Sequence, residues 1–157
     1  MKRIVFLLAV FFSANLYGQP MMGGMRDGRK AMEMISAIRI VKMQKALNLT
    51  DQQLASIIPK LNERDSLMRK YFDDQASDLK LLRDELAKSK PAEAKLKEII
   101  ERMKSREQNH EARVRELRNE ILAVLSTEQQ ARFIIFEVEF EREIRRLIDQ
   151  VRGRDDR

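Results

Sequence analysis

A single histidine is the first candidate for chemistry in this 157-residue chain. His110 has Glu107 three residues before it and Glu111 directly after it. A metal site needs several nitrogen, sulfur or oxygen ligands that converge on one point, and one imidazole with neighbouring carboxylates offers few. We therefore predict a packed histidine and no metal site. A change of charge at this side chain in acid stays open.

Methionines form the second group with chemical potential. Six of them gather early in the chain: Met21, Met22, Met25, Met32, Met34 and Met43. Thioethers are soft ligands for Cu(I), clustered methionines make adaptable contact surfaces, and methionine is also a common filler of helical cores. We favour a tail followed by a Met-rich core helix, and the other two interpretations stay open.

No arrangement of residues suited to catalysis is found. The chain has no Cys, which excludes disulfides, thiolate metal sites and cysteine nucleophiles. It has no Gly-rich phosphate loop after a strand, and one His with scattered Ser does not make a catalytic triad. Alternating glutamates from Glu137 to Glu143 would spread over the surface of a helix, where nearby arginines can pair with them. We predict a protein that is not an enzyme and needs no cofactor.

The elements that must position these residues begin with an export signal. Lys2 and Arg3 precede an unbroken apolar run from Ile4 to Phe12, and the sequence then turns small and polar up to Gly18. This order is typical of a secretory signal peptide, here residues 1–18, and the run is about half the ~20 residues that a spanning helix needs. We predict a periplasmic protein with no stable membrane span after cleavage.

The rest of the chain predicts an all-α fold. Charged residues make up 36% of the sequence, with only 5 Gly and 3 Pro, which is typical of long solvated helices. Apolar residues at three- to four-residue spacing predict four helices, over about 30–47, 51–86, 91–124 and 127–151. Pro59 is expected to kink the second helix, and Pro91 to occupy the first position of the third. A flexible tail over 19–29 and a disordered C-terminus over 153–157 would flank a helical domain at 30–152.

We expect the two long central helices to form an elongated antiparallel hairpin, which the first and last helices flank. Its long apolar stripes need cover from those flanking helices or from a partner chain. The net charge of +6 falls to +4, a mild excess, once Lys2 and Arg3 of the predicted signal peptide are left out, and acids and bases are interspersed. Because nucleic-acid binding needs a concentrated basic face, we expect no nucleic-acid partner.

Two helix starts share one pattern. Leu49-Thr50 is followed by Gln53, and Leu125-Ser126 is followed by Gln129. In a capping box, the hydroxyl accepts a hydrogen bond from the backbone three residues on, and the Gln side chain reaches back to the cap residue's own N–H. Either box alone is explained as a helix start.

Taken together, these two boxes resemble the LTxxQ motif that is repeated in the Spy/CpxP family of bacterial periplasmic proteins. The second motif departs from it by having Ser126 for Thr. The resemblance implies an all-helical, curved, often dimeric periplasmic protein in which the motif residues are structural. Members act as ATP-independent chaperones, as modulators of envelope-stress sensor kinases, or as metal sensors.

Two functions therefore stay open. The first is a chaperone-like protein that binds unfolded or stressed envelope proteins on apolar residues beyond the main stripes: Ile134, Ile135, Val138, Met32 and Met34. The second is an envelope-stress regulator or sensor that docks one partner, such as a sensor kinase or an anti-sigma factor. One form of this second hypothesis is a sensor that responds to a metal. The same apolar residues would also suit a dimer interface, and we expect a homodimer.

Overall fold

The computed structural model describes residues 25–155, with side chains from Lys30 to Asp149. These residues form four helices: α1 (Met25–Leu47), α2 (Asp51–Leu86), α3 (Glu93–Ala123) and α4 (Thr127–Asp155). No strand occurs between residues 25 and 155, so the all-α prediction is confirmed. The predicted signal peptide and the first part of the predicted tail lie outside the described residues.

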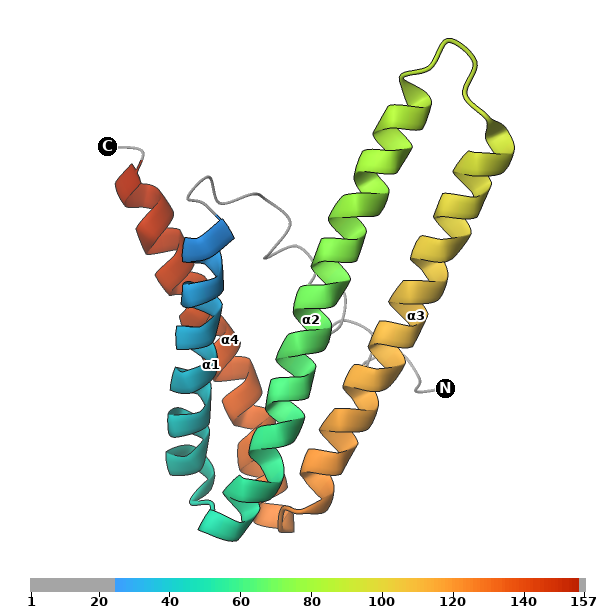
Figure 1. Ribbon diagram of the computed structural model, residues 1–157. Helices are drawn as coiled ribbons and strands as arrows, with labels where there is room; N and C mark the ends of the chain where they lie inside the picture. Colours follow the sequence, from blue (N-terminus) through green and yellow to red (C-terminus); the bar gives the residue numbers. More distant parts are fainter. Residues whose placement is uncertain (1–24, 156–157) are drawn as a thin grey trace, which may run out of the picture.

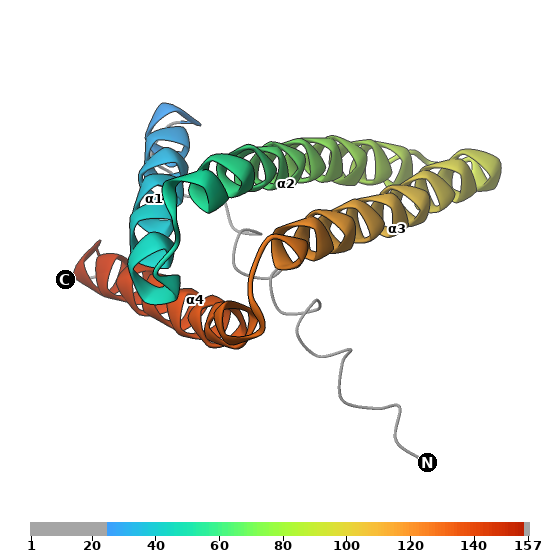
Figure 2. The ribbon, with the colours of Figure 1, turned by 90° about the horizontal axis from the view of Figure 1, so that it is seen from below.

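The helices pack as two antiparallel pairs that share one end of the molecule. α2 packs along α3 and forms the hairpin, whereas α1 packs on α4 and, less extensively, on α2. The α1–α2 and α3–α4 connections both lie at the bottom of Figure 1, which we call the base. Figure 2, seen from below, shows the α1–α4 pair standing beside the hairpin and diverging from it. The predicted hairpin with flanking helices is confirmed.

The helix bounds correct three predictions from the sequence: the start of α1, the end of α4 and the start of α3. α1 begins at Met25, so residues 25–29 are helical and not part of a flexible tail. α4 continues through Gly153 to Asp155, so the predicted disorder does not begin at residue 153. The start of α1 and the end of α4 each contain one Gly. A single Gly in a helix costs only about 1 kcal/mol relative to Ala, so both helices can extend through it. α2 spans the expected residues and is uninterrupted at Pro59, which is exposed.

The start of α3 is the third correction. Ala92 is its N-cap and Glu93 its first residue, so Pro91 precedes the helix instead of opening it. Ala92 has no side chain that can cap a helix, but its backbone N–H donates to Oε1 of Glu85 at 3.0 Å. A carboxylate from the end of α2 thus supplies the acceptor at this helix start.

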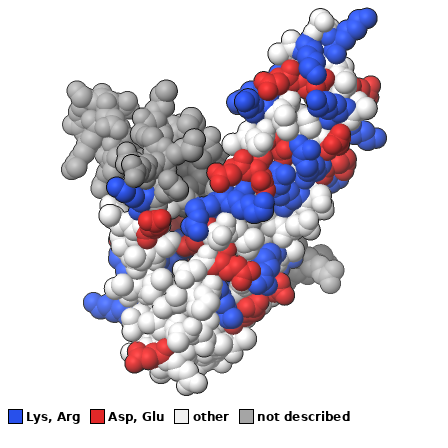
Figure 3. All heavy atoms as spheres, viewed as in Figure 1, with Lys and Arg blue, Asp and Glu red and all other residues white. Residues whose placement is uncertain are grey.

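Ion pairs, and not leucines, fill much of the seam in the outer half of the hairpin. Asp78 and Glu85, each 2% exposed, are the buried charged residues of the described chain, and neither belongs to a predicted apolar stripe. Leu79, Leu86 and Ile100 are 39%, 60% and 53% exposed there. Figure 3 shows acidic and basic side chains intermixed along this half of the hairpin.

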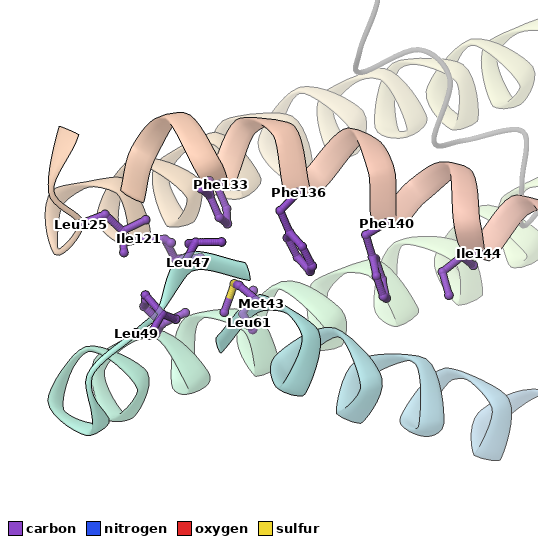
Figure 4. Close-up of a cluster of buried hydrophobic side chains, with 11 residues drawn as sticks. Met43, Leu47, Leu49, Leu61, Ile121, Leu125, Phe133, Phe136, Phe140 and Ile144 are labelled. Atoms are coloured by element: carbon purple, nitrogen blue, oxygen red, sulfur yellow. The ribbon is translucent and has the colours of Figure 1, made fainter. Parts of the chain in front are cut away.

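The apolar core lies at the base and along the α1–α4 pair. Figure 4 shows the buried stripe of α4 facing residues of α1 and of the two connections. Its buried members are Met43, Leu47, Leu49, Ile57, Leu61, Ile121, Leu125, Phe133, Phe136, Phe140 and Ile144. Each fully buried side chain of this size contributes about 1.5–3 kcal/mol. This core fixes the two motif segments against each other.

Candidate functional site

The first motif is a complete capping box at the start of α2. The backbone N–H of Gln53 donates to Thr50 Oγ1 at 3.2 Å, and the N–H of Thr50 donates to Gln53 Oε1 at 3.1 Å. Asn48 precedes it with φ of 50°, a left-handed conformation that Asn tolerates and that ends α1. The predicted cap is confirmed.

The second motif repeats this geometry at the start of α4. The N–H of Gln129 donates to Ser126 Oγ at 3.3 Å, and the N–H of Ser126 donates to Gln129 Oε1 at 3.0 Å. Ser therefore serves as well as Thr at this cap. The leucines that open the two motifs, Leu49 and Leu125, are both buried in the core.

The two glutamine side chains also bind each other. Gln53 Nε2 donates to Gln129 Oε1 at 2.8 Å, and Gln129 Nε2 donates to Gln53 Oε1 at 3.0 Å. Gln53 Nε2 also donates to the Val124 carbonyl at 3.0 Å, and Gln129 Nε2 to the Leu47 carbonyl at 3.3 Å. Because a primary amide has two donor hydrogens and an acceptor oxygen, each side chain is fully used.

This arrangement explains why the motif occurs twice. Each glutamine caps its own helix and also binds a carbonyl at the end of the helix before the other motif, α1 or α3. The pair therefore joins both connections at the base. The sequence predicted each cap but not the hydrogen bonds between Gln53 and Gln129. The sign of these bonds in the sequence was that the motif occurs twice.

The exposed apolar residues of α4 form a compact patch, which we call the α4 patch: Ile134, Ile135 and Val138. They are 52%, 57% and 46% exposed. Val138 lies two residues from both Phe136 and Phe140, which is about 200° around a helix, so the patch faces away from the buried stripe. The structure places these three predicted residues together.

The two predicted methionines do not join that patch. Met32 is half-buried, whereas Met34 is 65% exposed on α1. Since α1 and α4 pack through their other faces, the exposed residues of the two helices belong to separate surfaces. Ile38 and Val41 extend the surface of α1 beside Met34 and were missed as surface residues, because their spacing also suits a core stripe.

A third apolar surface lies on the hairpin. An open groove of about 380 Å³ runs between α2 and α3. Its lining is Tyr71, Gln75, Leu82, Ile100, Met103, Lys104, Arg106 and Glu107. Leu79 and Leu86 lie three and four residues from Leu82, so they share its side of α2.

His110 lies beside this groove as a packed ring. It stacks on Tyr71 with ring centroids 4.5 Å apart and an interplanar angle of 20°, so the predicted packed histidine is confirmed. Burial lowers the pKa of His110, and the charge of Glu111 opposes that shift. Within the described part of the chain, no three His, Asp or Glu side chains are grouped to hold a metal ion.

Two carboxylates hold the outer half of the hairpin. Asp78 accepts hydrogen bonds from Arg102, at 2.6 Å, and from Arg106, which also pairs with Asp74. Burial would raise the pKa of Asp78, but these guanidinium groups outweigh it and the pKa is lowered.

Glu85 acts in the same way at the turn of the hairpin. It accepts from Lys88 Nζ at 2.7 Å and from the Ala92 N–H, and Lys95 lies 3.5 Å away. The bond from Lys88 and then the bond from Ala92 lower the pKa of Glu85 to about 2. Its charge therefore persists well into acid.

Comparison with known proteins identifies the family of the chain. The family model of the LTXXQ motif family protein matches residues 35–134, which is more than half of the chain and includes both motifs. No curated protein and no solved structure matches the chain. No helix of the described residues has a stretch that is long and apolar enough to cross a membrane. By its paired motifs and this match, the chain belongs to the LTXXQ motif family.

Proposed function

We propose that this chain is a periplasmic, ATP-independent, chaperone-like protein that binds unfolded or stressed envelope proteins. The α4 patch is the observation that carries the proposal. Its three β-branched residues are about half exposed, although the opposite face of α4 already supplies the core with Phe133, Phe136 and Phe140. Contiguous apolar surface that the core does not use is typical of a binding site.

The surroundings of the α4 patch suit loose binding of varied clients. Glu139 and Arg142 are exposed beside it, so both signs of charge border the apolar area. Apolar contact provides affinity for exposed segments of an unfolded chain, and the mixed charges keep the free protein soluble. Membership of the LTXXQ family supports a place in the cell envelope.

The test is light scattering of a reduced, denatured client that is diluted into the chain from Gln19 to Arg157 without ATP. We expect suppression of aggregation at near-stoichiometric ratios. The variant Ile134→Ser/Val138→Ser should lose it, and the matched variant Met34→Ser/Val41→Ser on α1 should retain it. Circular dichroism and thermal melting establish that both variants fold.

A negative result would identify the other function. If the wild-type chain fails to suppress aggregation over a wide excess, general client binding is wrong. A single tight envelope partner, captured without general protection, would then make the protein a dedicated regulator or sensor. The α4 patch would in that case be the docking site of this one partner.

We also propose that the chain is a homodimer that pairs through the groove side of the hairpin. Ile100 lines the groove, Leu79 and Leu86 lie on the same side of α2 as its lining residue Leu82, and all three are exposed. A second hairpin would cover this apolar area on both copies at once, as a two-fold interface does.

Sedimentation velocity tests the dimer. Ile100→Glu should shift the chain to monomer by placing a charge in the interface. Leu81→Glu is the matched control, because Leu81 is 40% exposed on α2 but lies off the stripe of Leu79 and Leu86. A wild-type chain that is monomeric at tens of micromolar would rule this interface out.

A further inference from the structure

α1 carries an exposed apolar row that neither the core nor the proposed client site uses. Met34, Ile38 and Val41 are 65%, 38% and 67% exposed. They are spaced four and three residues apart, so they lie on one side of the helix. Val41 is two residues from the fully buried Met43, so this row, the α1 stripe, points away from the core.

Lysines stand at both ends of the α1 stripe. Lys30 lies four residues before Met34 and Lys45 four residues after Val41, so both extend the same row. Both are exposed, and neither pairs with an acidic group among the described side chains. Glu33 is the only acidic residue between Lys30 and Leu47. The row therefore combines apolar contact with an unbalanced positive charge.

The stripe is also accessible. α1 packs on α4 and α2 through its other side and lies at an edge of the molecule in both ribbon views (Figures 1 and 2). The α1 stripe is a ridge on one helix, whereas the groove described above lies between α2 and α3. A folded protein partner would need a matching groove for such a ridge, but a lipid headgroup layer is soft and adapts to it.

We propose that the α1 stripe docks the protein on an anionic lipid surface. Met34, Ile38 and Val41 enter the headgroup region, and Lys30 and Lys45 extend along the helix to lipid phosphates. Lysine stems lie on apolar surface while their ammonium groups reach the polar layer, which is the pattern of helices that lie in a membrane interface. The helix lies on the surface and does not span the bilayer.

The α4 patch provides the contrast that identifies the ligand. Its apolar exposure is similar, but both signs of charge border it: Glu139, Glu141 and Arg142 are exposed beside it, and Glu141 pairs with Arg145. These opposite charges offset one another, so the α4 patch has no excess positive charge that would attract an anionic surface. The two patches therefore predict different ligands and can be tested separately.

The experiment is co-sedimentation of the chain from Gln19 to Arg157 with vesicles of mixed phosphatidylglycerol and phosphatidylcholine. We expect binding that falls with added salt and is at least tenfold weaker on phosphatidylcholine alone. Lys30→Glu/Lys45→Glu should weaken it by more than tenfold, because each lysine near such a surface contributes about fivefold. Met34→Ser/Val41→Ser should also weaken it, and Ile134→Ser/Val138→Ser should not.

Three results would overturn the proposal: no binding to the anionic vesicles, binding that both α1 variants retain, or binding to soluble polyglutamate in place of vesicles. The last would assign the stripe to an acidic protein. Suppression of client aggregation, which the α1 variants should keep, reports on the α4 patch, so failure of one proposal is distinguishable from failure of the other.

Discussion

The side-chain amides of Gln53 and Gln129 donate hydrogen bonds to each other, with Nε2–Oε1 distances of 2.8 and 3.0 Å. The two residues are 76 positions apart, and each also accepts from the N-cap of its own helix. One pair of side chains thus determines where two helices begin and how the two connections meet. The motif is a structural joint, and the residues of the exposed apolar patches take no part in it.

Gln53→Ala should destabilise the fold by about 2 kcal/mol, since it removes a capping bond, the amide donor to the Val124 carbonyl and both hydrogen bonds between Gln53 and Gln129. Gln129→Ala should have a similar effect. Because the two side chains bind each other, the double variant should be less destabilised than the sum of the single variants, by about 1 kcal/mol. Urea unfolding followed by circular dichroism gives all three values.

Gln52→Ala is the matched control, because Gln52 is an exposed variable position within the motif and its side chain makes no bond to a described residue. It should change the free energy of unfolding by less than about 0.5 kcal/mol. Strict additivity of the Gln53 and Gln129 variants would contradict the joint.

The sequence could predict the four helices and both caps because these depend on local signals. Apolar spacing and the Thr50–Gln53 and Ser126–Gln129 pairs act within a few residues of each other. The bond between Gln53 and Gln129 could not be derived in this way, because nothing in a capping box says what its amide contacts across the fold. Only the packing of the core around Leu49 and Leu125 brings the two boxes together.

The hairpin seam was missed for a different reason. Asp78 and Glu85 lie among many charged residues of α2, and a charged residue on a helix is normally solvated. Their burial depends on cations that α3 and the turn bring within reach, such as Arg102 and Lys88. Leu79 and Leu86, which belong to the predicted apolar stripe, are exposed beside these contacts, so the stripe overestimated the extent of the core.

Asp78→Asn should loosen the outer half of the hairpin. The change keeps the shape of the side chain but removes the charge that faces Arg102 and Arg106. Since both guanidinium groups are partly exposed, at 39% and 26%, the loss should be about 1–2 kcal/mol, below that of a fully enclosed pair. Hydrogen exchange of amides near Asp78 should quicken, while amides around Phe133 remain protected.

Asp73→Asn on the same helix is the control, because Asp73 is exposed and has no partner among the described residues. Equal exchange in the two variants would mean that the buried ion pairs do not hold the hairpin.

Glu85 should make the turn of the hairpin sensitive to strong acid only. Its pKa is about 2 in the folded chain against an ordinary value of 4.5, so its contribution is fully present above 4.5 and is lost as the pH falls towards 2. Glu85→Gln keeps an acceptor for Ala92 but loses the charge that faces Lys88 and Lys95. The variant should melt at a lower temperature than the wild type at neutral pH, and the difference should shrink between pH 4.5 and 2.

Glu101→Gln, an exposed carboxylate of α3 without a described partner, should follow the wild type across this range. A Glu85→Gln difference that stays constant with pH would show that the carboxylate charge contributes nothing.

His110 should make stability fall at milder acidity. Burial against Tyr71 lowers its pKa below the ordinary 6.5, so as the pH falls from 6.5 towards that lower value the unfolded chain binds a proton that the folded chain does not. The contribution of neutral His110 to stability is therefore fully present above pH 6.5 and declines as the pH falls through this window. The charge of Glu111 reduces the size of the effect. His110→Phe keeps a ring on Tyr71 but cannot bind a proton, so urea midpoints of the variant should be flat where those of the wild type fall. Because the chain has one histidine, a wild-type slope that survives in His110→Phe would assign the titration to another group.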